Sequence, residues 1–352
     1  MAIKIDAKRL KWAALTVLTA MFLDGCKPIN QFFVKTFVKP AYLNTELLTE
    51  SIVLPYALET DDLEMSCMGA EAFTTFVMSG QRVMRKPSEL GTILYVAAGA
   101  CEEERAFNEE LEYLRYIRLQ QPDMAQDALI RQKTHHIKAA KRYLIGWNHF
   151  VESYKEYEIG SECAPMEQEY DQLVWLLGMF SGAQAMNHDI LSGVGVGVPK
   201  NLAALADRSM GCLSNTKWFG MPLALKAAVW SLLPGALPDG EDNWARLAQA
   251  EKIGEAAGVR IPTFIHLIVA HTKGDNKLVR EIIKRHVKSI ETTPSHPKYA
   301  AFDAVAIHGI QRISDKMWTE AMCHKTPVGG LGTFWDENAA DNIETVDLDD
   351  LF

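Results

Sequence analysis

The sequence predicts an all-α protein built as an array of antiparallel helix pairs, similar in shape to a tetratricopeptide-like (TPR-like) α-solenoid. Apolar residues recur at helical spacing over most of the chain, whereas the period-two alternation typical of strands is scarce. Gly or Pro stands in the breaks between the periodic segments, which suits helix hairpins with short loops. A strict 34-residue repeat is not legible, so the expected repeats are degenerate or similar only in shape.

The first 25 residues follow the pattern of a lipoprotein signal peptide. A basic start precedes an uncharged run of twelve residues (12–23), shorter than the roughly 20 residues that span a bilayer as a helix. Leu-Asp-Gly-Cys (23–26) resembles a bacterial lipobox and makes Cys26 the expected lipid acceptor, although Asp24 is acidic where lipoboxes usually have an uncharged residue. An uncleaved signal anchor and an ordinary first helix are the alternatives.

A lipidated Cys26 would anchor the protein to the cell envelope from the periplasmic side. Several acyl chains on one residue hold a protein to a membrane far more firmly than a single chain. Lys27 follows the cysteine, where an aspartate often retains lipoproteins in the inner membrane. The expected location is therefore the periplasm, with the outer membrane favoured over the inner.

Composition limits the kinds of partner. The 352-residue chain carries a net charge of −9, and because residues 1–25 contribute +2, the remainder carries −11. Nucleic-acid binding requires a basic footprint, so nucleic acid is not an expected partner. Five cysteines follow Cys26 without CxxC pairs or framework spacing: Cys67, Cys101, Cys163, Cys212 and Cys323. They are interpreted as small buried residues, with at most one or two bridges in an oxidising compartment.

The body divides into a tether with a first helical segment (26–60), a helical-repeat domain (61–321) and a C-terminal loop with an acidic tail (322–352). In the repeat domain, Asp61 is the expected N-cap of a helix that runs to about Lys86, with Glu64 three positions on. Pro87-Ser88 is expected to break it before a second helix starts at Glu89. Further helices are predicted at about 124–157, 169–188, 199–213, 217–233, 242–257, 261–273, 275–291 and 298–321.

A glycine-rich run, GVGVGVP (193–199), invites comparison with phosphate-binding loops. It does not follow a predicted strand, and Val198 stands where the GxGxxG pattern needs its third glycine. A connector with Pro199 in the first turn of the next helix is the better interpretation.

Four histidines raise the question of a metal site. His135 and His136 are adjacent and therefore point to different helix faces, while His266 and His271 are separated by five positions rather than the four of HExxH. No metal, cofactor or catalytic residue is expected, and no Ser-His-Asp or Cys-His arrangement is identifiable from spacing.

Acidic and aromatic residues form two further groups. Glu102, Glu103 and Glu104, with Glu109, Glu110 and Glu112, are interpreted as a solvated helix face compensated by nearby arginines, rather than as a carboxylate site. Most tryptophans are core candidates, and a few could line a ligand groove. Trp175 is the candidate for a ligand- or partner-facing aromatic residue, with core packing as its alternative.

Three stretches carry a resemblance to a known family. They are LVWLLGMFSGAQAM (173–186), LKAAVWSLLPGALPDGEDNWARLAQAEKIGEAAG (225–258) and NAADNIETVDLDDLF (338–352). Their order resembles the T component family of tripartite ATP-independent periplasmic (TRAP) transporters, over roughly residues 61–352. The resemblance implies a periplasmic lipoprotein of TPR-like helix pairs that forms a homotrimer. It also implies binding to a substrate-binding P component and, in one interpretation, to the solute.

Two other functions compete with that expectation. One is a general outer-membrane lipoprotein scaffold for protein–protein interactions in the envelope. The other is an enzyme acting on envelope glycans, which would need paired carboxylates converging in a cleft. No catalytic residue accompanies the resemblance, so the protein is not expected to be an enzyme.

Overall fold

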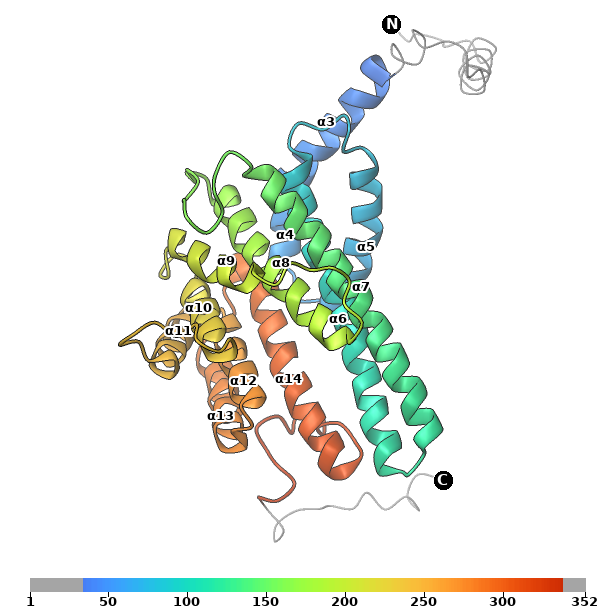
Figure 1. The fold of residues 1–352 in the computed structure, drawn as a ribbon, viewed down its shortest axis with the longest axis vertical. Helices are drawn as coiled ribbons and strands as arrows, with labels where there is room; N and C mark the ends of the chain where they lie inside the picture. The colour runs from blue at the N-terminus through green and yellow to red at the C-terminus, as the bar shows by residue number, and fades with distance from the viewer. Residues whose placement is uncertain (1–33, 338–352) are drawn as a thin grey trace, which may run out of the picture.

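The computed structural model describes residues 34–337. Within this range 74% of the residues are helical and no β-strand forms, which confirms the predicted all-α fold. From α5 to α13, each helix packs against the next one in the sequence, as expected for an array of helix pairs (Figure 1). None of the helices between residues 34 and 337 is long and apolar enough to span a bilayer.

The helices vary widely in length. In order they are α3 (Lys39–Leu48), α4 (Leu54–Glu59), α5 (Leu63–Ser79), α6 (Pro87–Arg118), α7 (Pro122–Ser153), α8 (Glu169–Ser192), α9 (Leu202–Ser209), α10 (Met221–Leu232), α11 (Asn243–Ala257), α12 (Ile261–Thr272), α13 (Asn276–Thr292) and α14 (Ala300–Met322). Short π-helical segments at Val34–Val38 and Thr49–Val53 lead into α3 and α4, and 3-10 turns follow α9 and precede α14.

The main core lies where α6, α7 and α8 pack against one another. Two glycines of α8 permit the close approach: a Cβ at Gly178 would lie 2.2 Å from the Phe150 ring, and one at Gly182 would lie 2.6 Å from the Trp147 ring. Both aromatic side chains are buried. The small residues in this part of α8 therefore make room for large aromatic groups of α7.

A second group of helices, α10–α13, forms smaller cores. One of them is shared with α14 and contains the fully buried side chains of Leu267, Ile283 and Ile310. Figure 1 shows α14 between this group and the long α6–α7 hairpin, and α14 contacts both α12 and α6. The last helix therefore joins the two parts of the molecule.

The structure corrects several predicted helix ends. The helix expected to run to about Lys86 ends at Ser79, and the one expected from about 217 begins at Met221. Asp62, not Asp61, is the N-cap of α5, because its carboxylate accepts a hydrogen bond from the Met65 N–H at 2.9 Å. Pro87 begins α6 instead of breaking a helix, since proline lacks the N–H that is unpaired at a first turn. The glycine-rich run is a connector as expected, but α9 begins only at Leu202, three residues after Pro199.

Several sequence predictions lie outside the described residues. These are the signal peptide (1–25), the lipid acceptor Cys26, and the third stretch of the resemblance (338–352). The part of the C-terminal segment that is described, 323–337, packs back onto the body, where Phe334 is 4% exposed in the same core as Ile310.

Candidate functional site

Two disulfides connect segments that are distant in the sequence. Cys67 of α5 pairs with Cys101 of α6, and Cys163 in the loop after α7 pairs with Cys212 in the turn after α9. Cys323 is a free thiol. The sequence allowed at most two bridges, but spacing alone could not give the pairing, because the partners meet only through the packing of helices.

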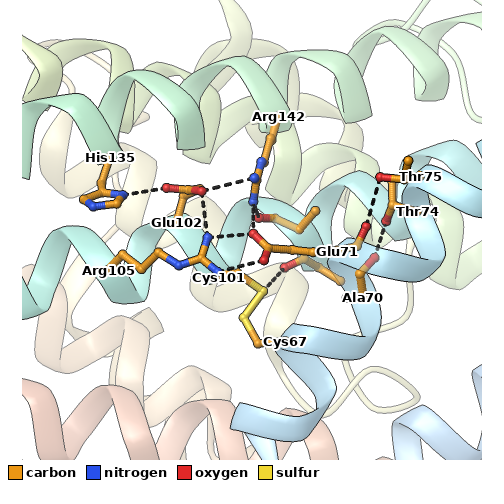
Figure 2. Close-up of polar contacts among 12 residues, drawn as sticks. Cys67, Ala70, Glu71, Thr74, Thr75, Cys101, Glu102, Arg105, His135 and Arg142 are labelled. Atoms are coloured by element: carbon orange, nitrogen blue, oxygen red, sulfur yellow. Dashed lines mark hydrogen bonds and ion pairs between the residues drawn. A yellow bond between two sulfur atoms is a disulfide. The ribbon is translucent and has the colours of Figure 1, made fainter.

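A network of charged side chains lies beside the first disulfide (Figure 2). Arg105 makes a bidentate contact with Glu71, with both N···O distances 2.7 Å, and also reaches Glu102 at 2.7 Å. Arg142 of α7 contacts both carboxylates, at 2.5 and 3.1 Å. The hydrogen bonds from Arg105, together with those from Arg142, outweigh partial burial and lower the pKa of Glu71 to about 2.

The interpretation of the acidic cluster as a solvated helix face is wrong for Glu102 and Glu103. Glu102 is 2% exposed, and its carboxylate lies 2.6 Å from Nδ1 of His135. Glu103 accepts hydrogen bonds from Gln184 at 2.9 Å and Tyr143 at 3.2 Å, and lies 3.2 Å from Nε2 of His188. Partner helices cover this face, which the spacing within α6 alone cannot reveal.

Nearby basic side chains keep the Glu103 carboxylate ionised despite its burial. Burial by itself would raise its pKa, but the hydrogen bond with His188 and the charges of His188 and Arg312 outweigh it and lower the pKa to about 2. The nearby His136, whose Nδ1 lies 2.9 Å from Nδ1 of His188, has its pKa lowered to about 4 by burial and by that neighbour.

These carboxylates hold helices together. Through Glu103, Glu104 and Glu110, α6 pairs with Arg312, His308 and Lys316 of α14. Every carboxylate of the triplet 102–104 has a basic partner within the described part of the chain. Because these partners come from α7, α8 and α14, the network ties α6 to three other helices.

The histidines are separated, as their spacing predicts. His135 contacts Glu102 of α6, whereas the adjacent His136 contacts His188 of α8. His266 lies 2.5 Å from Glu251. Among residues 34–337 no group of three or more His, Cys, Asp or Glu side chains could hold a metal ion.

Trp175 takes the core-packing alternative, which corrects its interpretation as a ligand- or partner-facing residue. Its side chain is 0% exposed, and the indole N–H donates to the carbonyl of Ser209 at 3.0 Å. The rings of Phe150 and Tyr154 pack edge-on against it. Its position inside the α7–α8 core leaves no surface for a ligand.

A pocket of about 540 Å³ lies among α11, α12 and α13 and is the candidate binding site. Its lining comprises Trp244, Ala248, Glu251, Lys252, Glu255, His266, Asp275, Leu278 and Arg285. Glu251 is 3% exposed and accepts from Arg285 Nε at 3.0 Å and Nη2 at 2.9 Å, in addition to its contact with His266. This buried carboxylate fixes the orientation of the arginine.

The sequence patterns single out no residue of this lining as ligand-binding. The tryptophans were core candidates as a group, of which a few could line a groove, and the one named for a ligand, Trp175, lies in the core. Positions 244, 248, 251 and 255 follow helical spacing and share one face of α11, so the stripe of one aromatic residue and two carboxylates was legible. The contribution of Arg285 was not, because it depends on how α13 packs against α11.

Comparisons with models of known protein families, with curated proteins and with solved structures found no match to this chain. The argument about function therefore rests on the sequence patterns and on the geometry described above.

Proposed function

We propose that this protein is an extracytoplasmic scaffold of TPR-like helix pairs, anchored to the cell envelope through Cys26, in a TRAP-type solute transport system. In this role it forms a homotrimer and binds the substrate-binding P component. A general envelope scaffold is the competing function, and it shares the anchor and the compartment. Only the partner separates the two.

The two disulfides support the extracytoplasmic location in this proposal, and the transport association rests on the resemblance. Such bonds form and persist in the periplasm and other oxidising compartments, and they are rare where thioredoxin and glutathione keep thiols reduced. Cys67–Cys101 and Cys163–Cys212 leave Cys323 as the free thiol among the five that follow Cys26. This pattern agrees with the signal-like first 25 residues, from which it is independent.

The placement of the resembling stretches gives further support. The first (173–186) forms the middle of α8, where its small residues allow the close approach to α7. The second (225–258) spans most of α10, all of α11 and the loop between them. Both stretches thus belong to packed helix pairs, the architecture that the resemblance implies.

Thiol trapping and lipid labelling test the compartment. Protein taken directly from cells into acid and then treated with a maleimide reagent should react at Cys323 alone among the five cysteines after Cys26. Metabolic labelling with an alkyne palmitate should mark the protein, and Cys26→Ser should remove the label, because no other cysteine lies at the end of the apolar run. Full reactivity of all five thiols, or unchanged label in the variant, would refute the anchored extracytoplasmic function.

Partner capture tests the transport association. The soluble form lacking residues 1–26 is expected to be a trimer by light scattering and to bind a P component at about micromolar affinity, which suits reversible handover. The acidic chain predicts that binding weakens as salt rises. A monomer that binds no P component at low salt would favour the general envelope scaffold instead.

A further inference from the structure

The pocket among α11, α12 and α13 has features that binding to another protein does not require. Its volume of about 540 Å³ falls within the range of small-molecule sites, roughly 300–1,000 Å³. Its lining combines apolar surface with acidic and basic groups. Such a combination of one apolar wall and a few convergent polar groups is typical of a binding site.

Two basic side chains line the pocket, and each has donor groups without a partner among residues 34–337. Glu251 engages Nε and Nη2 of Arg285, while Nη1 has no hydrogen-bond partner in the described part of the chain. The Arg285 side chain is 45% exposed and lines the pocket. Lys252 is exposed, also lines the pocket and has no ion pair among residues 34–337. These two groups are suited to a ligand carboxylate.

Glu255 supplies the opposite charge. It lies one helical turn after Glu251 on α11 and lines the pocket, yet it makes no ion pair within the described residues. One of its carboxyl oxygens is buried without a hydrogen-bond partner. Burial, followed by the negative charge of Glu251, raises its pKa. A ligand cation would provide the counter-charge that the protein does not.

Apolar surface completes the lining. Trp244 and Ala248 stand on the same face of α11 as the two glutamates, and Leu278 contributes from the first turn of α13. Asp275 also lines the pocket, but its Oδ1 is already engaged, because it accepts from the Leu278 N–H at 3.0 Å as the N-cap of α13.

We propose that this pocket binds the zwitterion of an apolar α-amino acid. Arg285 and Lys252 take the ligand carboxylate, and Glu255 takes the ammonium group. The apolar side chain packs against Trp244 and Leu278. A ligand with a carboxylate alone would leave Glu255 without a counter-charge, and a ligand with an amine alone would leave the basic groups without one. The site does not depend on the compartment or on the P component.

Three compounds with the same branched apolar chain test the assignment: L-leucine, 4-methylpentanoate, which lacks the ammonium group, and 3-methylbutylamine, which lacks the carboxylate. Calorimetric titrations of the soluble form lacking residues 1–26 measure the three affinities. We expect L-leucine to bind with a Kd below about 1 mM. It should bind at least about tenfold more tightly than either analogue, because each analogue leaves a polar group of the site unpaired. Equal binding of 4-methylpentanoate, or no binding of L-leucine, overturns the proposal.

A matched pair of variants locates the ammonium site. Glu255→Gln keeps the shape of the side chain and removes its charge, so it should weaken L-leucine binding about tenfold while leaving the binding of 4-methylpentanoate unchanged. Glu320→Gln is the control, because burial also raises the pKa of this glutamate, which lies on α14 and does not line the pocket. Glu320→Gln should bind L-leucine as the original protein does. Equal losses in both variants would place the ammonium site elsewhere.

Discussion

At the scale of single residues, His286 of α13 links burial to acid sensitivity. Its side chain is 0% exposed, and neither ring nitrogen has a hydrogen-bond partner within the described chain. Burial, together with the charge of Arg260, lowers its pKa to about 3. In the unfolded chain a histidine has a pKa of about 6.5, so between these values the unfolded state binds a proton that the folded state does not. Stability must therefore fall as the pH falls from about 6.5 toward 3.

Replacing this histidine tests the linkage. His286→Leu removes the titrating group and the two unpaired nitrogens at similar volume, so the variant should be more stable than the original at pH 7. The difference should grow by about 2 kcal/mol at pH 5, since each pKa unit of separation contributes about 1.4 kcal/mol. Urea unfolding followed by circular dichroism at both pH values measures it. An equal difference at pH 7 and pH 5 would contradict the assignment.

Residue-level chemistry was the hardest part to predict from the sequence. The kinds of residue can be read from the sequence, since the three consecutive glutamates at 102–104 and the helical stripe at 244, 248, 251 and 255 are visible as patterns. Their partners cannot, because Arg142, His188 and Arg312 reach α6 from three other helices. A carboxylate looks solvated until the helix that covers it is known, and that information lies in tertiary packing rather than in local spacing.

At the scale of helices, a buried ion pair fixes the junction of α12, α13 and α14. Arg260 and Asp303 are both 0% exposed, and their N···O distance is 2.5 Å. The guanidinium also donates to Oγ and the carbonyl of Ser289, at 2.9 and 2.8 Å. Removing one member of a buried pair leaves the other charge without compensation, which costs more than the pair itself contributes.

Asp303→Asn should accordingly lower the free energy of unfolding by about 3–5 kcal/mol. Asp336→Asn is the matched control, because Asp336 also pairs with an arginine, Arg280, at 2.7 and 2.9 Å but on the surface. Exposed pairs are weakened by solvent and salt, so this variant should be nearly unchanged. Chemical denaturation of both variants in one buffer decides the comparison. Similar losses would show that burial does not set the energetic weight of these pairs.

Helix positions were largely predictable, because they follow from local periodicity and from Gly and Pro. The predicted segments 242–257, 261–273 and 275–291 each lie within one residue of α11, α12 and α13 at both ends. The failures occurred at helix ends. The cap of α5 is Asp62 rather than its neighbour Asp61, α5 stops at Ser79 rather than about Lys86, and Pro87 begins α6 instead of breaking a helix. The pairing of helices beyond immediate neighbours, such as α14 with α6, has no local signal.

At the scale of the whole molecule, the two disulfides act on the unfolded chain as much as on the folded one. Cys67–Cys101 closes a loop of 34 residues and Cys163–Cys212 one of 49. In the chain-entropy model, loops of this length stabilise a protein by about 4 kcal/mol each, because they reduce the freedom of the unfolded state. That is a large part of the roughly 5–15 kcal/mol of net stability of an ordinary domain. The fold should therefore depend on an oxidising environment.

The double replacements Cys67→Ser with Cys101→Ser, and Cys163→Ser with Cys212→Ser, should each reduce the free energy of unfolding by about 4 kcal/mol. Cys323→Ser is the control and should leave it nearly unchanged, because this thiol is free. Adding a reductant to the original protein should lower its unfolding midpoint, while each double variant should respond less, since one bond is already gone. Urea unfolding with and without dithiothreitol measures all four proteins. If reductant and both double replacements leave the midpoint unchanged, the cysteines do not cross-link the chain, and the argument for an oxidising compartment fails with them.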